Sequence, residues 1–392
     1  MKIAVIGAGA SGLTCAIVIK RLGHAAVVFE KNSRAAKKLL ATGNGRCNLT
    51  NVNMDLSYYH GDTGFASYAL SSFNQYDVMN FMESLGVVPV IEEDRIYPYS
   101  FQASSVVDML RLGAEGMEKC EEEVIKLTPL KNEFQIHTKK DIYKFDKVIV
   151  CCGGKAAPRL SGGGSYELLT KLGHSMTELK PAIVQLKAKG TKAMDGIKVN
   201  ALVKMGDKTE KGEVLFTSYG LSGPPILQLS RDAVGKAIEL DLAPDLDFGR
   251  ICDILNNKKI FPELTLENLF TGFLNKKVGR EILRFADIMP FSREAKSLSD
   301  KEIKKLASLV KCLPFEIEGT MGFDNAQVTA GGIKCSEFDD KTMESKLHKG
   351  LYAAGEVLDV DGDCGGYNLQ WAFSSAHLAA LSACREAEND KT

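Results

Sequence analysis

A glycine-rich turn near the start of the chain has the residue types that bind a nucleotide pyrophosphate. Residues 7–12 read Gly-Ala-Gly-Ala-Ser-Gly, between an apolar segment, Ile3–Ile6, and a stretch with helical spacing, Ala10–Leu22. In this context the first glycine permits a tight turn, the second lets the backbone approach a pyrophosphate, and the third lets the helix pack closely on the strand. The helix N-terminus then offers unpaired N–H groups and a positive dipole end to the phosphates.

An acidic residue follows where a dinucleotide site needs one. Glu30 comes about twenty residues after the glycines and ends a second buried strand, Ala26–Phe29. Its carboxylate can accept hydrogen bonds from both hydroxyls of an adenosine ribose, and it would repel a 2′-phosphate. The pattern therefore predicts FAD or NAD as the bound dinucleotide, and not NADP.

A second unusual stretch, residues 39–51, reads LLATGNGRCNLTN. Gly43 and Gly45 suggest a close backbone approach to a ligand, and Arg46 could bind a phosphate or an anionic group of a flavin or substrate. Cys47 has no second cysteine nearby, which favours packing over a catalytic role. The polar residues of this stretch that could bond a ring or cap a turn are Asn48 and Asn51.

Two late segments could form the second contact region that the isoalloxazine ring of a flavin needs. Residues 350–356 form a short strand that ends at Gly355 and Glu356, and residues 364–369 lead into a helix over 370–387. The N-terminus of this helix could face the pyrimidine edge of a flavin, where reduction develops negative charge. A plain connection between loop and helix, without a ligand, is the alternative at this point.

The elements that position these residues begin with a strand, a helix and a second strand, which is the opening of a parallel α/β sheet. A further apolar strand over 147–152 runs into Gly153 and Gly154. A helix is expected from Ser104 to Cys120, and a three-stranded meander is expected over 124–145.

The pattern changes after Pro181. Residues 245–311 have helical periodicity, and near Val328 the glycine-rich, apolar style of the first part resumes. The first domain is therefore predicted to be interrupted by an insert over roughly 190–320. The antiparallel strands expected in this insert and just before it are 183–188, 197–205 and 210–217.

Composition and charge narrow the class of protein. The chain has 392 residues, 45% of them hydrophobic and 25% charged, which is typical of a globular protein that buries a large core. Lys and Arg number 49 and Asp and Glu number 50, so the net charge is −1. This balance argues against broad electrostatic binding to nucleic acid or to an anionic membrane, and it leaves a local basic patch open. The expected partner is a small-molecule substrate, without nucleic acid or membrane. No apolar run is long enough to predict a transmembrane helix.

Cysteine and histidine spacing gives no support for a metal site. None of the ten cysteines forms a C-x-x-C pair, and the six histidines are scattered without an H-x-x-x-H pair. Unpaired cysteines of this kind fit a reducing compartment, so the cytoplasm is the expected location.

Together the motifs converge on a family. The chain resembles the BaiN/RdsA-type FAD-binding oxidoreductases, also called aminoacetone-oxidase-like flavoproteins, almost end to end. The most specific match is the block 350–373, which includes GEVLDVDG and CGGYNLQWA. The other matching stretches are 7–12 with Glu30-Lys31, 42–51, 95–98, 220–224 and 328–333.

The resemblance implies a fold and a set of FAD contacts. The fold would be α/β, with a Rossmann-like FAD-binding domain interrupted by a β-barrel-like insert and a small helical subdomain. The expected ranges are 1–189 and 326–392 for the FAD-binding domain, 190–244 and 312–325 for the insert, and 245–311 for the helical subdomain. The residues expected to contact FAD are Gly7, Gly9, Ala10, Ser11, Gly12, Glu30, Lys31, Gly43, Gly45, Arg46, Cys47, Val124, Gly153, Gly355, Glu356, Gly366, Asn368 and Leu369.

The resemblance leaves the reaction open, since members are linked both to reduction of conjugated C=C bonds in dehydro-bile acids and to oxidation of aminoacetone. The first expectation is a flavin reductase of such a bond in a small apolar substrate. NADH or NADPH would visit the flavin transiently, because the chain has one dinucleotide fingerprint. The alternatives are a flavin amine oxidase acting on a small aminoketone with oxygen, and a non-enzymatic flavin-binding redox protein. The residues considered for catalysis are Arg46, Tyr367 and Asn368.

Overall fold

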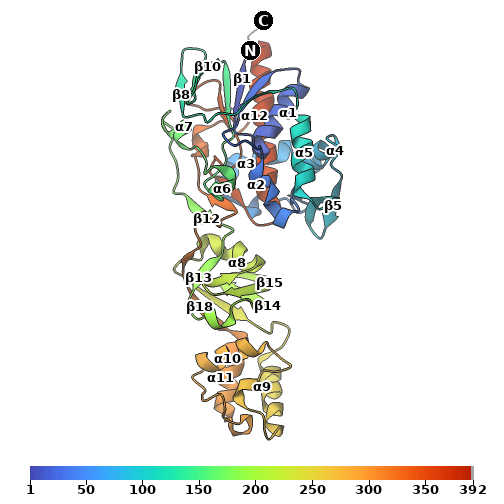
Figure 1. The fold of residues 1–392 in the computed structure, drawn as a ribbon, viewed down its shortest axis with the longest axis vertical. Helices are drawn as coiled ribbons and strands as arrows, with labels where there is room; N and C mark the ends of the chain where they lie inside the picture. The colour runs from blue at the N-terminus through green and yellow to red at the C-terminus, as the bar shows by residue number, and fades with distance from the viewer. Residues whose placement is uncertain (390–392) are drawn as a thin grey trace. The chain divides into compact units, whose positions relative to one another are not determined.

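The structure is a computed structural model that describes residues 1–389, and it divides into two compact units (Figure 1). Unit 1 contains residues 1–182 and the chain from Phe323 onward, and unit 2 contains Ile183–Gly322. Each unit has its own hydrophobic core. Among the described residues, no helix combines the length and the hydropathy needed to cross a bilayer.

Unit 1 is built on a five-stranded parallel sheet in the order β20-β11-β1-β2-β7. The chain moves outward from β1 in both directions, so the topological switch point lies between β1 and β11. Both of these strands are buried along their whole length, as is typical of parallel strands with both faces covered. The five strands are β1 (Ile3–Ile6), β2 (Ala26–Phe29), β7 (Glu118–Cys120), β11 (Lys147–Val150) and β20 (Leu351–Ala353).

The longest helices of unit 1 pack together. Helix α1 follows β1 directly and lies along α12, which also packs against α3 (Figure 1). The predicted first helix and last helix are thereby confirmed to within a few residues. The helices of unit 1 are α1 (Ala10–Arg21), α2 (Lys37–Leu40), α3 (Thr63–Ser72), α4 (Gln75–Glu83), α5 (Ala103–Gly113), α6 (Pro158–Ser161), α7 (Glu167–Thr170) and α12 (Tyr367–Asn389).

Four small sheets complete unit 1. The predicted meander is confirmed as the antiparallel sheet β10-β9-β8. The sheet β3-β6-β5 and the pairs β4–β21 and β12–β19 were not predicted. Their strands are β8 (Lys126–Pro129), β9 (Phe134–His137), β10 (Ile142–Phe145), β3 (Thr50–Asn51), β5 (Pro89–Glu92), β6 (Arg95–Pro98), β4 (Tyr59–Gly61), β21 (Val360–Gly362), β12 (Lys180–Ala182) and β19 (Val328–Ala330).

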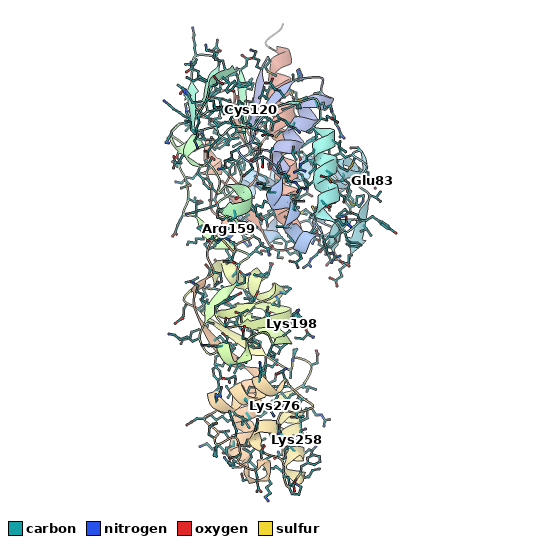
Figure 2. The ribbon with its side chains drawn as sticks, in the orientation of Figure 1. Glu83, Cys120, Arg159, Lys198, Lys258 and Lys276 are labelled. Carbon is teal, nitrogen blue, oxygen red and sulfur yellow. The ribbon has the colours of Figure 1, made fainter. Side chains whose placement is uncertain are left out.

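The helix predicted from Ser104 to Cys120 is wrong in its second half. Helix α5 ends at Gly113, and the chain then forms β7, whose last residue is Cys120 (Figure 2). Gly116 takes a left-handed conformation, with φ at 91°, which a helix cannot continue through. The strand was missed because β7 is an edge strand with exposed residues, and therefore lacks the apolar alternation of a half-buried strand.

Unit 2 contains a closed antiparallel barrel in the order β13-β16-β15-β14-β17-β18. The expected barrel-like fold is confirmed, although β16, which closes the barrel, was not predicted. The finer division that makes the helices a separate subdomain over 245–311 stays a prediction, and barrel and helices share one hydrophobic core. The elements are β13 (Leu186–Ala188), β14 (Lys198–Met205), β15 (Lys208–Thr217), β16 (Gly220–Ser222), α8 (Pro224–Leu229), β17 (Ala237–Asp241), α9 (Phe248–Asn257), α10 (Lys276–Phe285), α11 (Asp300–Lys311) and β18 (Leu313–Thr320).

Candidate dinucleotide-binding site

Five of the residues singled out in the sequence follow the carboxyl ends of the five parallel strands. Gly7 follows β1, Glu30 follows β2, Val124 lies in the loop after β7, Gly153 follows β11 and Gly355 follows β20. Because the strands are parallel, all five loops lie at one edge of the sheet. This edge, at a switch point, is where open α/β sheets bind their ligands.

The glycine-rich turn is tightly built at both ends and open in the middle. Gly7 has φ at 101°, and a Cβ there would lie 2.5 Å from the backbone oxygen of Cys151. A Cβ on Gly12 would collide with the backbone oxygen of Gly7. A Cβ on Gly9, in contrast, would have no neighbour within 4 Å. Gly9 is the N-cap of α1 and offers no side-chain acceptor, so the first N–H groups of the helix can bind an anion.

Glu30 is held beside this turn by three hydrogen bonds. Its Oε2 accepts from the backbone N–H of Ala8 at 2.9 Å, and its Oε1 accepts from the backbone and side-chain N–H groups of Asn32 at 2.8 Å. The carboxylate is therefore oriented before any ligand binds, and it retains lone-pair capacity for a ribose hydroxyl. Lys31 has a different role, since its Nζ donates to the backbone oxygen of Gly162 at 2.8 Å and holds that loop.

Gly355 and Glu356 join the end of β20 to the glycine-rich turn and to the neighbouring loops. Gly355 has φ at 78°, and a Cβ there would collide with Oγ of Ser11 in the first turn of α1. The Glu356 carboxylate accepts from the backbone N–H of Thr329 at 2.8 Å and lies 2.6 Å from the Lys38 Nζ. Through these contacts, Glu356 links β19 and α2 to the loop that follows β20.

Arg46 is already paired within the protein. Its guanidinium forms an ion pair with Glu92 and lies over the rings of Tyr97 and Phe101, with its central carbon 4.2 and 4.5 Å from the ring centroids. A ligand would have to share or displace Glu92 to use this charge. The loop itself turns through Gly43 and Gly45, both with positive φ.

Cys47 and Asn48 follow Arg46 and are both buried. Burial raises the pKa of the Cys47 thiol to about 12, so the thiol stays protonated at neutral pH, which fits the predicted packing role. The Asn48 side chain has Oδ1 buried without a hydrogen-bond partner in the part of the chain that the structure describes. An unpaired buried amide oxygen is costly, so a ligand that donates a hydrogen bond to Asn48 Oδ1 would be favoured here.

The start of α12 packs against the loop around Asn51. Asn51 Nδ2 donates to the backbone oxygen of Gly365 at 3.0 Å, and a Cβ on Gly366 would lie 2.6 Å from the carbonyl carbon of Thr50. The Asn368 side chain bonds both the N–H and the C=O of Gly362, at 2.8 and 2.6 Å. Asn368 therefore positions this loop.

Tyr367 is likewise engaged in packing. Its hydroxyl donates to the backbone oxygen of Asn53 at 3.1 Å, and its ring stacks on Tyr58 with centroids 4.7 Å apart. Burial raises the pKa of Tyr367, which makes it a poor proton donor at neutral pH. Leu369, in the same first turn, is half-buried.

The structure reveals a histidine–carboxylate pair that the sequence did not suggest. His60 Nε2 lies 2.7 Å from Oδ1 of Asp363, and both side chains are partly exposed. Asp363 begins the loop that leads into α12, and His60 lies in β4, which pairs with β21. The two residues are separated by 303 positions in the chain, so no local motif could have signalled the pair.

The arrangement fits an FAD more closely than a metal or a bare anion. A Cβ added at Gly9 or Gly153 would have no protein atom within 4 Å, so both positions leave open space. No side chain caps the N-terminus of α1, and the Glu30 carboxylate is oriented to accept hydrogen bonds from a ribose. The amide oxygen of Asn48, unpaired among the described residues, adds a hydrogen-bond acceptor in the loop over residues 39–51. Within the described residues, no group of three His, Cys, Asp or Glu side chains could hold a metal ion.

Comparison with known proteins agrees with this geometry. The family model described as the HI0933-like protein Rossmann domain matches residues 1–382. The chain is 37% identical over 404 residues to the 3-dehydro-bile acid delta(4,6)-reductase of Clostridium scindens, covering 97% of this chain and 98% of that one. It is 29% identical over 399 residues to the ribosomal RNA dihydrouridine synthase of Haemophilus influenzae, again covering 97% and 98%.

A solved structure supports the fold alone. The open conformation of a flavocytochrome c3 fumarate reductase matches with a TM-score of 0.50 at 15% identity, covering 98% of this chain and 78% of that chain. Family and relatives together make the protein an FAD-dependent oxidoreductase, which removes the non-enzymatic alternative. The chain therefore belongs to the HI0933-like family of Rossmann-type FAD-binding proteins.

Proposed function

We propose that the protein reduces a C=C bond conjugated to a carbonyl group in a small apolar substrate such as a dehydro-bile acid, with NADH or NADPH as the electron donor. The observation that carries this proposal is the 37% identity to the Clostridium scindens reductase over nearly the full length of both chains. When bound, FAD would accept two electrons from the nicotinamide and pass them to the conjugated bond.

The residues of this chain would hold and orient the cofactor. The N-terminus of α1 would bind the pyrophosphate above Gly9, and Glu30 would accept hydrogen bonds from the ribose. The backbone around Gly153 and Gly355 would line the cofactor, while Glu356 and Asn368 keep the surrounding loops in place. The nicotinamide would bind transiently, since the chain has a single dinucleotide fingerprint.

Anaerobic mixing of the FAD-loaded protein with NADH or NADPH tests the proposal. We expect one of the two to bleach the visible flavin band, and a 3-oxo bile acid with conjugated double bonds to restore it. The matched control is the same bile acid with the ring saturated, which offers no bond to reduce. A flavin that stays oxidised with both nicotinamides would contradict the proposal, and rapid re-oxidation by oxygen with an aminoketone as donor would favour the oxidase alternative.

A uridine in ribosomal RNA is the second candidate substrate, because the Haemophilus influenzae relative matches over the same length at 29% identity. Dihydrouridine differs from uridine by reduction of a C=C bond conjugated to a carbonyl group, so the chemistry is shared and the substrate differs. The net charge of −1 argues against a broad nucleic-acid surface. The reduced protein can be offered an unmodified ribosomal RNA transcript beside the bile acid. Re-oxidation by the RNA alone would select the second candidate.

The reduction also needs a proton on the second carbon, and the His60–Asp363 pair is the candidate source. An imidazole held by a carboxylate can donate a proton and be refilled from solvent. We expect His60→Ala to lower kcat by about a hundredfold with FAD content unchanged, and added imidazole to restore part of the rate. The control is His24→Ala, because His24 lies just beyond the C-terminal end of α1. An unchanged rate in His60→Ala would mean that solvent supplies the proton.

A further inference from the structure

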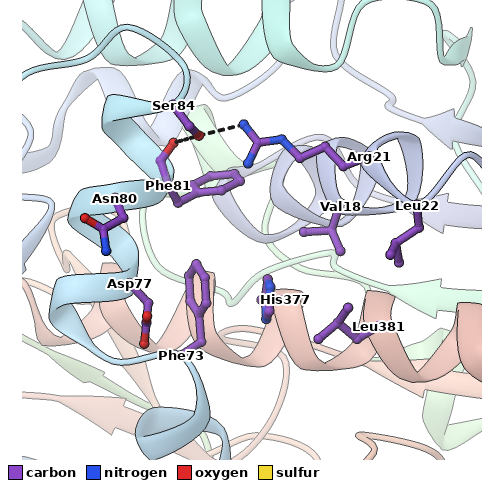
Figure 3. Close-up of a pocket in the computed structure, with 10 residues that line it drawn as sticks. All are labelled: Val18, Arg21, Leu22, Phe73, Asp77, Asn80, Phe81, Ser84, His377 and Leu381. Atoms are coloured by element: carbon purple, nitrogen blue, oxygen red, sulfur yellow. Dashed lines mark hydrogen bonds between the residues drawn. The ribbon is translucent and has the colours of Figure 1, made fainter.

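A groove of about 360 Å³ lies between α1, α4 and α12, away from the glycine-rich turn (Figure 3). Its α1 residues belong to the last turns of that helix, whereas the glycine-rich turn, residues 7–12, ends within the first turn of the helix. Its α12 residues begin at His377, roughly 15 Å along the helix from Tyr367 at 1.5 Å per residue. The groove is therefore separate from the candidate dinucleotide site.

The floor of the groove is aromatic. The imidazole of His377 stacks on the ring of Phe73, with centroids 4.0 Å apart and an interplanar angle of 15°. Phe81 meets Phe73 edge to face at 6.0 Å, and Figure 3 shows all three rings directed into the same space. Burial lowers the pKa of His377 to about 4, so the ring is neutral at pH 7 and can serve as a flat surface.

The aromatic floor of the groove is held in place by α12. The backbone oxygen of Phe73 accepts hydrogen bonds from Gln370 Nε2 at 2.9 Å and from Ser374 Oγ at 2.6 Å. Gln370 and Ser374 are fully buried in α12. A floor fixed in this way loses little conformational freedom when a ligand binds, which favours binding.

Among the residues that the structure describes, Arg21 is the cation that lines the groove, and its guanidinium has N–H donors left for a ligand. The guanidinium of Arg21 lies 5.0 Å from the centroid of Phe81 and donates one hydrogen bond, to Ser84 Oγ at 2.7 Å. A guanidinium has five N–H donors, and two parallel ones match a carboxylate. Asp77, the acid that lines the groove, is engaged at the start of α4, where its Oδ2 accepts from the backbone N–H of Asn74 at 2.8 Å.

From this arrangement we infer that the groove binds a planar aromatic carboxylate of one or two rings. Because Phe73 covers one face of the His377 imidazole, the rings would stack on its other face, beside Val18 and Leu381, and the carboxylate would bind Arg21. The volume of about 360 Å³ is at the lower end of the range for small-molecule sites. The site does not depend on the proposed reaction.

Calorimetric titration of the FAD-loaded, full-length protein with 2-naphthoate tests this inference. We expect one binding site per chain. Arg21→Gln should weaken the affinity at least about tenfold, since it removes a charge-assisted hydrogen bond, and Leu381→Trp should abolish binding by filling the groove. Lys20→Gln removes a neighbouring positive charge of α1 outside the groove, and it should bind as the unmodified protein does.

Several outcomes would overturn the inference. No heat of binding with the unmodified protein would do so directly. Equal affinity in Arg21→Gln and Lys20→Gln would remove the carboxylate contact, and unchanged binding in Leu381→Trp would place the naphthoate elsewhere. FAD content and the thermal midpoint, measured for each variant, show whether it folds. Arg21 is exposed, so its variant keeps the test decisive if Leu381→Trp misfolds.

Discussion

Replacing Gly9 by valine is expected to leave the protein folded and to remove its FAD. The backbone at Gly9 is extended, with φ at −79° and ψ at −163°, which valine adopts readily, and a Cβ there meets no protein atom within 4 Å. The added side chain would instead occupy the open space above the N-terminus of α1, where the pyrophosphate is expected. Affinity for FAD should fall at least about a hundredfold, or roughly 3 kcal/mol. The ratio of flavin to protein after purification measures this, and the thermal midpoint reports the fold.

Two other glycines make the result specific. Gly64 lies in α3, where an added Cβ has only ordinary contacts, so Gly64→Val should keep both fold and FAD. Gly12→Ala should lose both, because its Cβ would collide with the backbone of Gly7. A Gly9→Val protein purified with full FAD would refute the assignment of the phosphate site.

Gly355→Ala is expected to reduce the free energy of unfolding by roughly 2–4 kcal/mol and to lower FAD retention with it. The residue has φ at 78°, and its Cβ would collide with Oγ of Ser11. The collision is relieved only if Ser11 Oγ rotates away or if β20 or the first turn of α1 moves, and each of these changes borders the candidate site. Chemical denaturation of the variant and of the unmodified protein, each with excess FAD, measures the change.

A second substitution separates collision from backbone strain. Ser11→Gly removes Oγ, so in the double variant Gly355→Ala with Ser11→Gly only the left-handed conformation is penalised, at about 1–2 kcal/mol. The effects of the two substitutions should therefore be non-additive. Strict additivity would show that Ser11 is not what excludes a side chain at position 355.

The parts of the site that could be predicted from sequence are those whose geometry is local. The turn at residues 7–12 combines a strand, three glycines and a helix within a short stretch. Gly7 and Gly12 have no room for a side chain, and Gly9 leaves open the space that a ligand would fill. The roles of Arg46 and Asn368 could not be predicted from the sequence in the same way. Arg46 is occupied by Glu92 and two aromatic rings, and Asn368 by the backbone of Gly362, which only the folded chain brings together.

Long-range pairing explains the remaining differences. The His60–Asp363 pair and the pairing of β3 with β6 join distant segments, and neither carries a periodic signal. The strand β7 was hidden because an exposed edge strand needs no apolar alternation. In contrast, the buried strands β1, β2 and β11 were found because continuous burial selects apolar residues throughout.

The pairing of β12 with β19 bears on how large an insertion the FAD-binding unit can carry. These strands flank unit 2, and within unit 2 the first barrel strand, β13, pairs with the last, β18. Closing an unstructured loop becomes harder with length, by about 0.6 kcal/mol for each doubling. Once the barrel has folded, however, the pairing of β13 with β18 brings the two ends of the insert together. Joining β12 to β19 then costs little additional chain entropy, whatever the length of the chain between β13 and β18. Evolution can therefore exchange or enlarge the inserted module at this junction without raising the entropic barrier to folding of the host.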